Sequence, residues 1–195
     1  MSTSIDLPVV VFSAHRLIAR GPLGEVLADI HAAAEAEAAP LVIDLATGRA
    51  VDLDLRGTLD EAKARLTAAP EAEKRGPGRP KLGVTAREVT LLPRHWDWLA
   101  GQPGGASVAL RKLVEGALRE AEGPDRARHS KDATYRFMTA LAGDLPGYEE
   151  ATRMLFAGDW TAFDAAVEGW PEGVREVARG MAAGAWRNGA GSVLD

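Results

Sequence analysis

Closely spaced cations lie in a stretch rich in glycine and proline, "KRGPGRPK", which covers residues 74–81. The cations and the proline among them are Lys74, Arg75, Arg79, Pro80 and Lys81. Proline keeps a chain extended, and cations spaced along an extended chain suit a row of phosphates. The stretch therefore indicates either an arm that binds an anion or a soluble linker, and its composition alone leaves both interpretations open.

The charge of the chain is divided into blocks. The 195 residues have a net charge of −5, but residues 1–73 carry −6, residues 74–131 carry +6 and residues 132–195 carry −5. A basic block between acidic ends is typical of a chain with one anion-binding face. Chance clustering of charges is the alternative interpretation.

The other chemically capable residues are too scattered to indicate catalysis. The chain has no cysteine, which excludes disulfides and thiolate chemistry, and it has no glycine-rich phosphate loop. Asp52 and Asp54 alternate with apolar residues and so share one face of an extended segment, where they either bind a metal or simply face solvent. The histidines show no metal-binding spacing and are His15, His31, His95 and His129. We therefore expect that the protein is not an enzyme and that it binds neither a cofactor nor a metal.

Residues 1–67 predict a small α/β domain with the order β-β-α-β-β-α. "PVVVFSA" and "RLIARG" are strand candidates, and "PLGEVLADIHAAAEAEA" has apolar residues at helical spacing after Pro22. Next, "PLVIDL" and "AVDLDLRG" flank the turn "ATG", and "TLDEAKARL" begins with Thr58, a good N-cap. The expected fold class is α+β.

Residues 68–85 and 131–190 differ sharply in composition. The first stretch is poor in apolar residues and predicts a basic Gly/Pro linker. The second predicts an all-helical segment through "KDATYRFMTALAG", "GYEEATRMLFAG", "DWTAFDAAVEGW" and "PEGVREVARGMAAGAWRNG". Its aromatic residues either line a ligand pocket or pack in the core, and they are Trp160, Phe163, Trp170 and Trp186.

Residues 86–122 predict one strand followed by two helices. Val89 and Leu91 alternate with polar residues, Pro93 opens the first helix and Ser107 caps the second. The second helix carries an apolar stripe formed by Leu110, Leu113, Val114, Ala117 and Leu118. Since a lone strand with two short helices cannot close a core, we expect two copies to pair through strand 86–92, with four helices burying the stripes.

The residues "VTLLP", "GGAS" and "LRKLVEGAL" resemble the ribbon-helix-helix family of DNA-binding dimers, the Arc and MetJ type. The resemblance implies a two-stranded ribbon in the major groove, with Ala86, Glu88 and Thr90 facing the bases. It also implies that a phosphate binds at the start of the second helix, to the amides of Gly105, Ala106 and Ser107. Glu88 departs from the family, whose ribbons present Arg, Lys, Asn or Thr. In this phase Arg87 points toward the helices, so either it reaches out to solvent or the register shifts by one residue.

"GPGRPK" resembles part of an AT-hook, a motif that binds the minor groove through a Gly-Arg-Pro centre. The resemblance implies that Arg79 enters the narrow groove of an A-tract while the flanking cations contact phosphates. Pro77 stands where the motif has its first arginine, so we expect weak binding by this stretch alone. A DNA-binding surface would bring Arg94, Arg111 and Lys112 onto the face of the arm.

Over nearly its whole length the chain also resembles a bacterial family described only as a domain of unknown function. "TGRAVDLDLRG", "RHWDWLAGQPGGASVALRKLVE" and "LPGYEEATRMLFAGDW" carry this resemblance, which implies no activity. We expect a homodimeric, sequence-specific or AT-preferring DNA-binding protein, either a transcriptional regulator or a nucleoid-associated factor. The alternative is an interaction protein that uses the strand-helix-helix segment only to dimerise or to bind a partner.

The sequence also bears on location and partners. No cationic stretch precedes the short apolar run at residues 7–12, and no segment approaches the ~18 apolar residues of a membrane span. We therefore expect a cytoplasmic protein without membrane partners. The C-terminal helices are a candidate surface for a protein partner.

Overall fold

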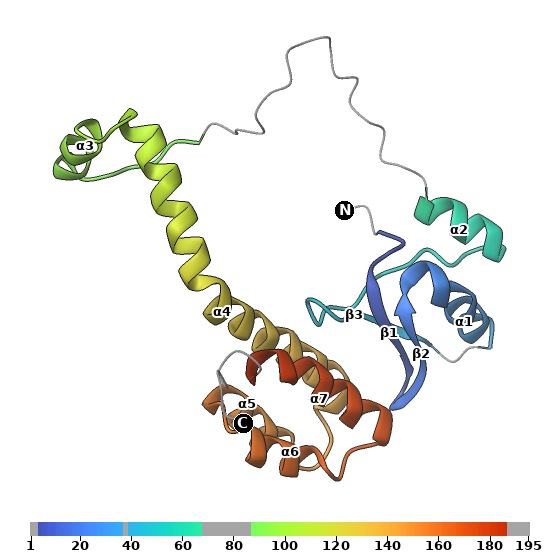
Figure 1. Ribbon diagram of the computed structural model, residues 1–195. Coiled ribbons are helices and arrows are strands. Elements are labelled where there is room, and N and C mark those ends of the chain that lie inside the picture. The colour runs from blue at the N-terminus through green and yellow to red at the C-terminus, as the bar shows by residue number, and fades with distance from the viewer. Residues whose placement is uncertain (1–3, 37–38, 68–86, 187–195) are drawn as a thin grey trace, which may run out of the picture. The chain divides into compact units, whose positions relative to one another are not determined.

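The chain divides into two compact units in the structure, which is a computed structural model describing residues 4–36, 39–67 and 87–186. The first unit combines residues 1–70 with residues 124–195, and the second comprises residues 71–123. The N-terminal domain and the C-terminal helical segment, which the sequence presents as separate, thus belong to one unit (Figure 1).

The predicted α+β class is confirmed. The first unit contains a three-stranded sheet and helices from both ends of the chain. Its elements are β1 (Pro8–Ser13), β2 (Arg16–Pro22), α1 (Leu23–Glu35), β3 (Leu41–Asp44), α2 (Leu59–Thr67), the C-terminal part of α4 (Gly105–Ala142), α5 (Tyr148–Ala157), α6 (Trp160–Val167) and α7 (Glu172–Trp186). Among the described helices, none is both long and apolar enough to cross a membrane.

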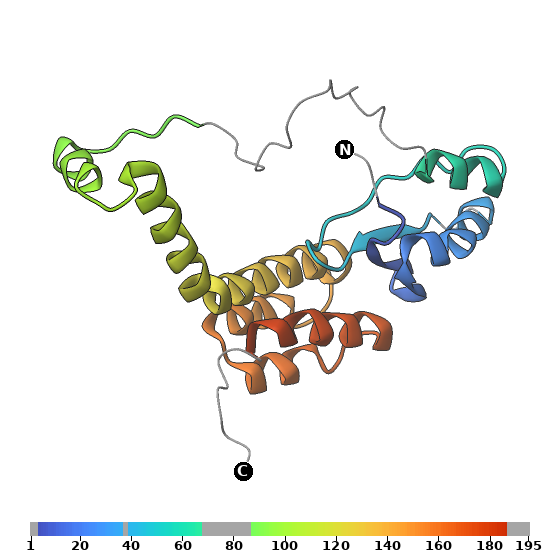
Figure 2. The ribbon, with the colours of Figure 1, turned by 45° about the horizontal axis from the view of Figure 1, so that its top comes forward.

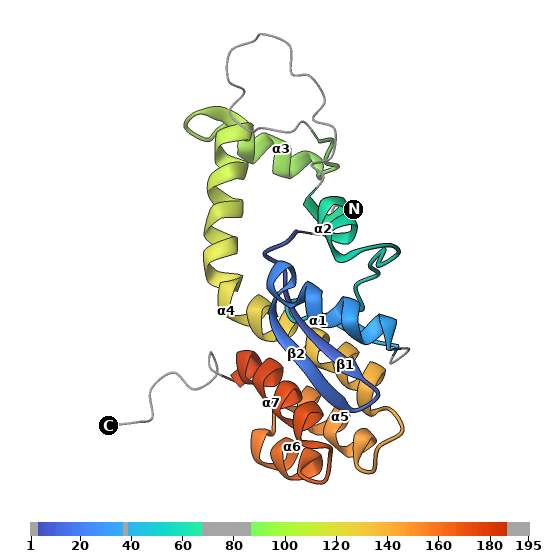
Figure 3. The same cartoon turned by 90° about the vertical axis from the view of Figure 1, so that its right-hand side faces the viewer.

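Strand β1 lies at the centre of the sheet, between antiparallel neighbours in the order β2-β1-β3. Successive side chains of a strand point to opposite faces, so the run from Val9 to Phe12 supplies two cores. Val9 and Val11 pack with Val26 and Ile30 of α1 on one face. The sheet therefore has α1 against one face and the C-terminal helices against the other (Figure 3).

The second core joins the two ends of the chain. Val10 and Phe12 pack with buried residues of α4 to α7, and the rings of Phe12 and Phe137 have centroids 5.9 Å apart. Figure 2 shows α5, α6 and α7 alongside the C-terminal half of α4. Both strand faces are thus buried, which explains why four consecutive apolar residues occur in β1.

The predicted turn after β3 is present and docks on α4. The Asp44 carboxylate accepts hydrogen bonds from the Ala46 amide (2.8 Å) and the Thr47 hydroxyl (2.6 Å). The Arg136 side chain on α4 donates to the carbonyl oxygen of Thr47 at 3.0 Å. Gly48 has φ 68°, and a Cβ there would lie 1.9 Å from the carbonyl oxygen of Ala133. The turn therefore fits against α4 only with glycine at this position.

The predicted fourth strand is reduced to one bridge, between Ile43 and Ala50. Residues 51–55 continue without a strand, although the amide of Val51 still donates to the carbonyl oxygen of Val42 at 2.8 Å. The predicted alternation is confirmed, because Val51, Leu53 and Leu55 pack toward the α1 core while the intervening aspartates are exposed. The apolar face thus anchors this segment against the α1 core without a full ladder of backbone hydrogen bonds.

The C-terminal aromatic residues are core residues. Phe163 and Trp170 are buried, and Trp160 and Trp186 pack against the same core, with ring centroids 4.9 Å apart. The indole N–H of Trp170 donates to the carbonyl oxygen of Pro146, and that of Trp186 to the carbonyl oxygen of Gly158, each at 2.9 Å. Their polar atoms are thus satisfied within the fold, as buried indoles require.

Candidate nucleic-acid interface

Only part of the predicted DNA-binding surface falls within the described residues. Those that lie outside are Lys74, Arg75, Arg79, Pro80, Lys81 and Ala86. In the second unit the structure describes residues 87–123, which contain an extended segment, a short helix and the start of α4.

Helix α3 (Pro93–Ala100) begins where the sequence predicts. Leu92 is extended, with φ −67° and ψ 150°, and its carbonyl oxygen accepts hydrogen bonds from the amides of His95 and Trp96. Pro93 fills the first helical position, where its missing N–H costs nothing and its fixed φ favours the helix. Arg94 therefore lies in the first turn of α3.

The start of α4 differs from the prediction. Gly104 and Gly105 have φ values of 86° and 74°, and the helix begins at Gly105, so Ser107 lies inside its first turn instead of capping it. The amide of Gly105 donates to the carbonyl oxygen of Gln102 at 2.9 Å and is already used within the turn. Of the three amides predicted to hold a phosphate, those of Ala106 and Ser107 lie in the first turn, where a helix leaves amides without a helical acceptor.

Residues 87–92 form no strand in this single chain. Glu88 and Thr90, the predicted base-facing residues, are exposed, and so is Val89 on the expected inner face (54%). An extended segment without a neighbour has no hydrogen-bonding partner for its backbone, so a ribbon here requires a second chain. The register of this segment stays a prediction.

A shallow apolar groove lies between α3 and the first turns of α4. Its walls are Leu91, Arg94, His95, Trp98, Leu99, Leu110 and Leu113. His95 stands out in the sequence only as one of the scattered histidines, and Trp98 has no predicted role. The available signal was spacing within the helix, because Trp98 and Leu99 lie three and four residues after His95, and residues three or four positions apart share one face of a helix.

The second unit leaves most of its large apolar side chains uncovered. Within residues 87–123, Leu99 and Ala109 are the only buried residues. The exposed large apolar side chains in this range are Val89, Leu92, Trp96, Trp98, Leu113, Val114 and Leu118. Exposed apolar groups at this density mark an interaction surface.

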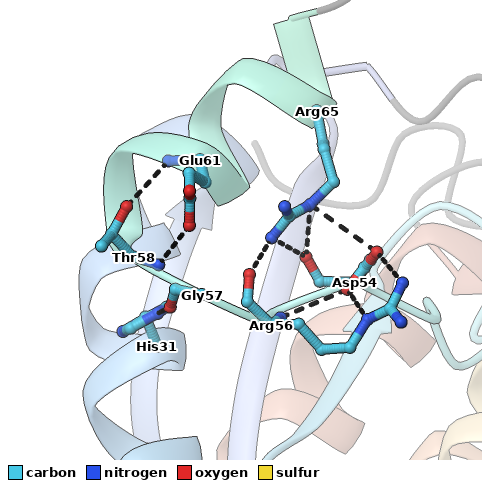
Figure 4. Close-up of polar contacts among 7 residues, drawn as sticks. All are labelled: His31, Asp54, Arg56, Gly57, Thr58, Glu61 and Arg65. Carbon is cyan, nitrogen blue, oxygen red and sulfur yellow. Dashed lines mark hydrogen bonds and ion pairs between the residues drawn. The ribbon is translucent and has the colours of Figure 1, made fainter.

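A second group of polar residues links α1, the 53–58 segment and α2 in the first unit (Figure 4). The Arg56 guanidinium donates to both oxygens of the Asp54 carboxylate, at 2.8 and 2.7 Å. Arg65 on α2 donates to the carbonyl oxygens of Asp54 and Arg56. The contact between Asp54 and Arg56 could have been predicted from the sequence, because residues 54 and 56 share one face of an extended segment.

The same segment is held at its far end by α1 and by the cap of α2. The His31 imidazole contacts the carbonyl oxygen of Gly57 at 2.9 Å. Thr58 and Glu61 form a reciprocal cap, since the Thr58 amide donates to the Glu61 carboxylate (2.8 Å) and the Glu61 amide to the Thr58 hydroxyl (3.3 Å). Thr58 is therefore the N-cap that the sequence predicts, and His31 is structural.

Of the two aspartates, Asp54 contacts cations of the fold. Asp54 is held by arginines, and in the described part of the chain no group of three or more His, Cys, Asp or Glu side chains is placed to hold a metal ion. The hydrogen bond from the Arg56 side chain, followed by the one from its amide, holds the pKa of Asp54 well below its usual range.

We expect the Asp54 contacts to stabilise the fold in a pH-dependent way. Because the folded-state pKa is lowered, the stabilisation is complete above the ordinary carboxyl pKa of about 4 and is lost as the pH falls below it. Asp54→Asn should lower the urea midpoint of unfolding at pH 7, and the difference from wild type should shrink at pH 3. The pair is exposed, so the effect is modest.

Asp52→Asn is the matched control, since Asp52 is an exposed carboxylate two residues away on the same face. It should leave the midpoint unchanged at both pH values. Equal midpoints for Asp54→Asn and wild type at pH 7 would show that the arginine contacts do not hold α2.

Comparison with known families gives one match, which spans most of the chain. Residues 8–182 match the family model described as "Uncharacterized protein conserved in bacteria (DUF2239)". Comparison with curated proteins gives no match, and comparison with solved structures gives none. The match includes the sheet and both units, so the two units occur together in this family.

Proposed function

We propose that this chain, which belongs to the DUF2239 family of uncharacterized bacterial proteins, is a homodimeric DNA-binding protein, either a transcriptional regulator or a nucleoid-associated factor. The observation that carries the proposal is the uncovered apolar surface of the second unit, which directly follows a basic arm in the sequence. An element of this size with so little buried surface gains stability by pairing.

In the proposed dimer the 86–92 segments of two chains form the ribbon. Thr90 faces the bases of the major groove, and the first-turn amides of Ala106 and Ser107 bind a phosphate. The arm before the ribbon places Arg79 in an adjacent minor groove, where the negative potential of A-tracts attracts arginine. The acidic first unit, which combines both ends of the chain, stays away from the phosphates.

A second candidate function is favoured by Glu88 and by the composition of the exposed surface. Glu88 is exposed in the predicted base-facing row, and a carboxylate there repels phosphates. The uncovered side chains are mainly apolar and aromatic, which suits a protein partner at least as well as DNA. In this alternative the strand-helix-helix segment dimerises or binds a protein, and the cations of the arm provide solubility.

The DNA proposal is tested by binding to short AT-rich and GC-rich duplexes over a salt series. We expect tighter binding to the AT-rich duplex and a steep fall of log affinity with log salt, because released counterions drive phosphate binding. Arg79→Ala should remove the AT preference and reduce the salt slope by about two, which is one for each chain of the dimer. Thr90→Ala should weaken binding without changing the slope, since it removes a base contact and no charge.

Lys63→Ala is the matched control, because Lys63 is an exposed cation of the first unit. Its binding curve should coincide with that of the wild type. If the wild-type dimer binds neither duplex at low salt, the DNA proposal fails and the interaction protein remains. If Arg79→Ala and Lys63→Ala behave alike, the arm does not enter the minor groove.

A further inference from the structure

We propose that residues 51–67 form a strap, which opens as one unit while the sheet and the C-terminal helices stay folded. The strap comprises the segment after Ala50 together with helix α2. When it opens, the chain leaves the folded part of the first unit at Ala50 instead of after Thr67, which lengthens the connection toward the basic arm in the sequence. The strap lies wholly in the first unit, so the inference goes beyond the proposed function and does not require DNA.

Little of the strap is buried. Of residues 51–67, all of which the structure describes, Ala62 alone is buried. Four apolar side chains are partly buried against the α1 core, and they are Val51, Leu53, Leu55 and Leu66. By contrast, the four residues from Val9 to Phe12 in β1 are fully buried. Because the free energy of opening rises with the apolar surface that becomes exposed, the strap opens at a lower free energy than the sheet.

The backbone of the strap is anchored at two places. The Val51 amide donates to the carbonyl oxygen of Val42 at 2.8 Å, and the His31 imidazole on α1 contacts the carbonyl oxygen of Gly57 at 2.9 Å. Residues 51–57, which are described throughout, form no strand between these anchors. Helix α2 has nine residues, and a helix of that length is not stable alone in water. Its helical hydrogen bonds are therefore lost when the strap opens.

Arg65 joins the two parts of the strap (Figure 4). Its guanidinium on α2 donates to the carbonyl oxygen of Asp54 at 3.2 and 3.1 Å and also to that of Arg56. Since these contacts hold α2 to the segment that precedes it, the two parts open together. The core shared by the sheet and helices α4 to α7 is formed by residues outside the strap, so it stays packed when the strap opens.

Amide hydrogen exchange of the full-length protein, in urea concentrations below the unfolding transition, tests the proposal. Exchange of the α2 amides should depend weakly on urea, because the dependence scales with the surface that opening exposes. The β1 amides should exchange through global unfolding and depend steeply on urea. If the α2 and β1 amides share one free energy of opening and one urea dependence, the strap is not a separate unit and the proposal is overturned.

A substitution in the core separates the two kinds of opening. Phe12→Ala should speed exchange of the β1 amides by at least about a hundredfold, because a buried phenylalanine side chain is lost. The α2 amides should keep their wild-type rates, since Phe12 stays packed when the strap alone opens. Acceleration of α2 and β1 by the same factor would mean that α2 opens only with the whole unit, contrary to the proposal.

A substitution in the strap tests the role of Arg65. Arg65→Ala should speed exchange of the α2 amides by about threefold to tenfold, because the contacts with the two carbonyl oxygens are lost while alanine still favours a helix. Lys63→Ala is the matched control, since Lys63 is an exposed cation two residues away on the same helix, and it should stay close to the wild-type rate. Equal rates for the two variants would show that Arg65 does not hold the strap together and would overturn the proposal.

Discussion

Replacing Gly48 by alanine is expected to destabilise the first unit by at least about 3 kcal/mol, a large fraction of the 5–15 kcal/mol typical of a domain. Gly48 has φ 68°, where a side chain costs about 1–2 kcal/mol. The added Cβ would also lie 1.9 Å from the carbonyl oxygen and 2.7 Å from the carbonyl carbon of Ala133. Ala133 is 3% exposed within α4, so neither backbone can move away without opening the core.

The measurement is urea unfolding followed by circular dichroism, with Gly180→Ala as the control. A Cβ at Gly180 meets no atom within 4 Å, and the residue lies inside α7, where alanine is favoured over glycine by about 1 kcal/mol. The two Gly→Ala changes should therefore shift the midpoint in opposite directions. A Gly48→Ala protein as stable as the wild type would show that the turn does not contact α4.

Local features of the first unit could be predicted because they depend on residues close in sequence. The strands β1 and β2 follow from short apolar runs, and the start of α2 follows from Thr58 and Glu61, three residues apart. The alternation at residues 51–55 correctly predicts which side chains face the core. In each case the information lies within a few residues, where helix and strand periods apply.

Features that depend on distant residues could not be predicted in the same way. The sequence places a boundary between the chain's ends, yet Phe12 and Phe137 share a core. The contact between Gly48 and Ala133 is indicated in the nearby sequence only by a glycine in a turn. The run of buried residues in β1 was the one available signal, because a strand with apolar residues on both faces needs a layer on each side.

Helix α4 shows the limit of a local rule. Gly123 and Pro124 predict the end of a helix, since proline cannot donate to the carbonyl four residues before it. In the structure α4 continues through Pro124 as one helix of 38 residues. Past the proline, α4 supplies the core with Ala133, Phe137 and Met138. Tertiary packing at that end favours helix beyond what the local sequence indicates.

In the second unit, the apolar residues of α4 are exposed in the predicted row, but the predicted start of α4 is wrong. Serine is a common N-cap residue, which is why the sequence predicts a cap at Ser107. Gly104 and Gly105 have positive φ and turn the chain earlier, so the helix begins at Gly105. A strand at residues 86–92 stays a prediction, because residues 87–92 are not paired with another strand in this chain. What the sequence missed was the groove that His95 and Trp98 help to line.

Because the two ends of the chain share one core, Phe12→Ala is expected to destabilise helices that are distant from it in the sequence. Removing a buried phenylalanine side chain costs about 3–5 kcal/mol. Phe12 is fully buried between the sheet and the C-terminal helices, and a Cβ added to Gly173 in α7 would lie 3.5 Å from the Phe12 ring. Amide hydrogen exchange of α7 should therefore accelerate strongly in Phe12→Ala at neutral pH.

Phe156→Ala is the control, because it removes the same side chain from a 48% exposed position. Its cost is limited to the edge contact with Tyr135, about 1 kcal/mol, although Phe156 lies much closer to α7 in the sequence than Phe12 does. If the two ends of the chain were independent domains, Phe12→Ala would speed exchange in β1 and β2 and leave α7 unchanged. Acceleration of α7 by the distant change, and little by the near one, would show that the sheet and helices unfold together because they share one core.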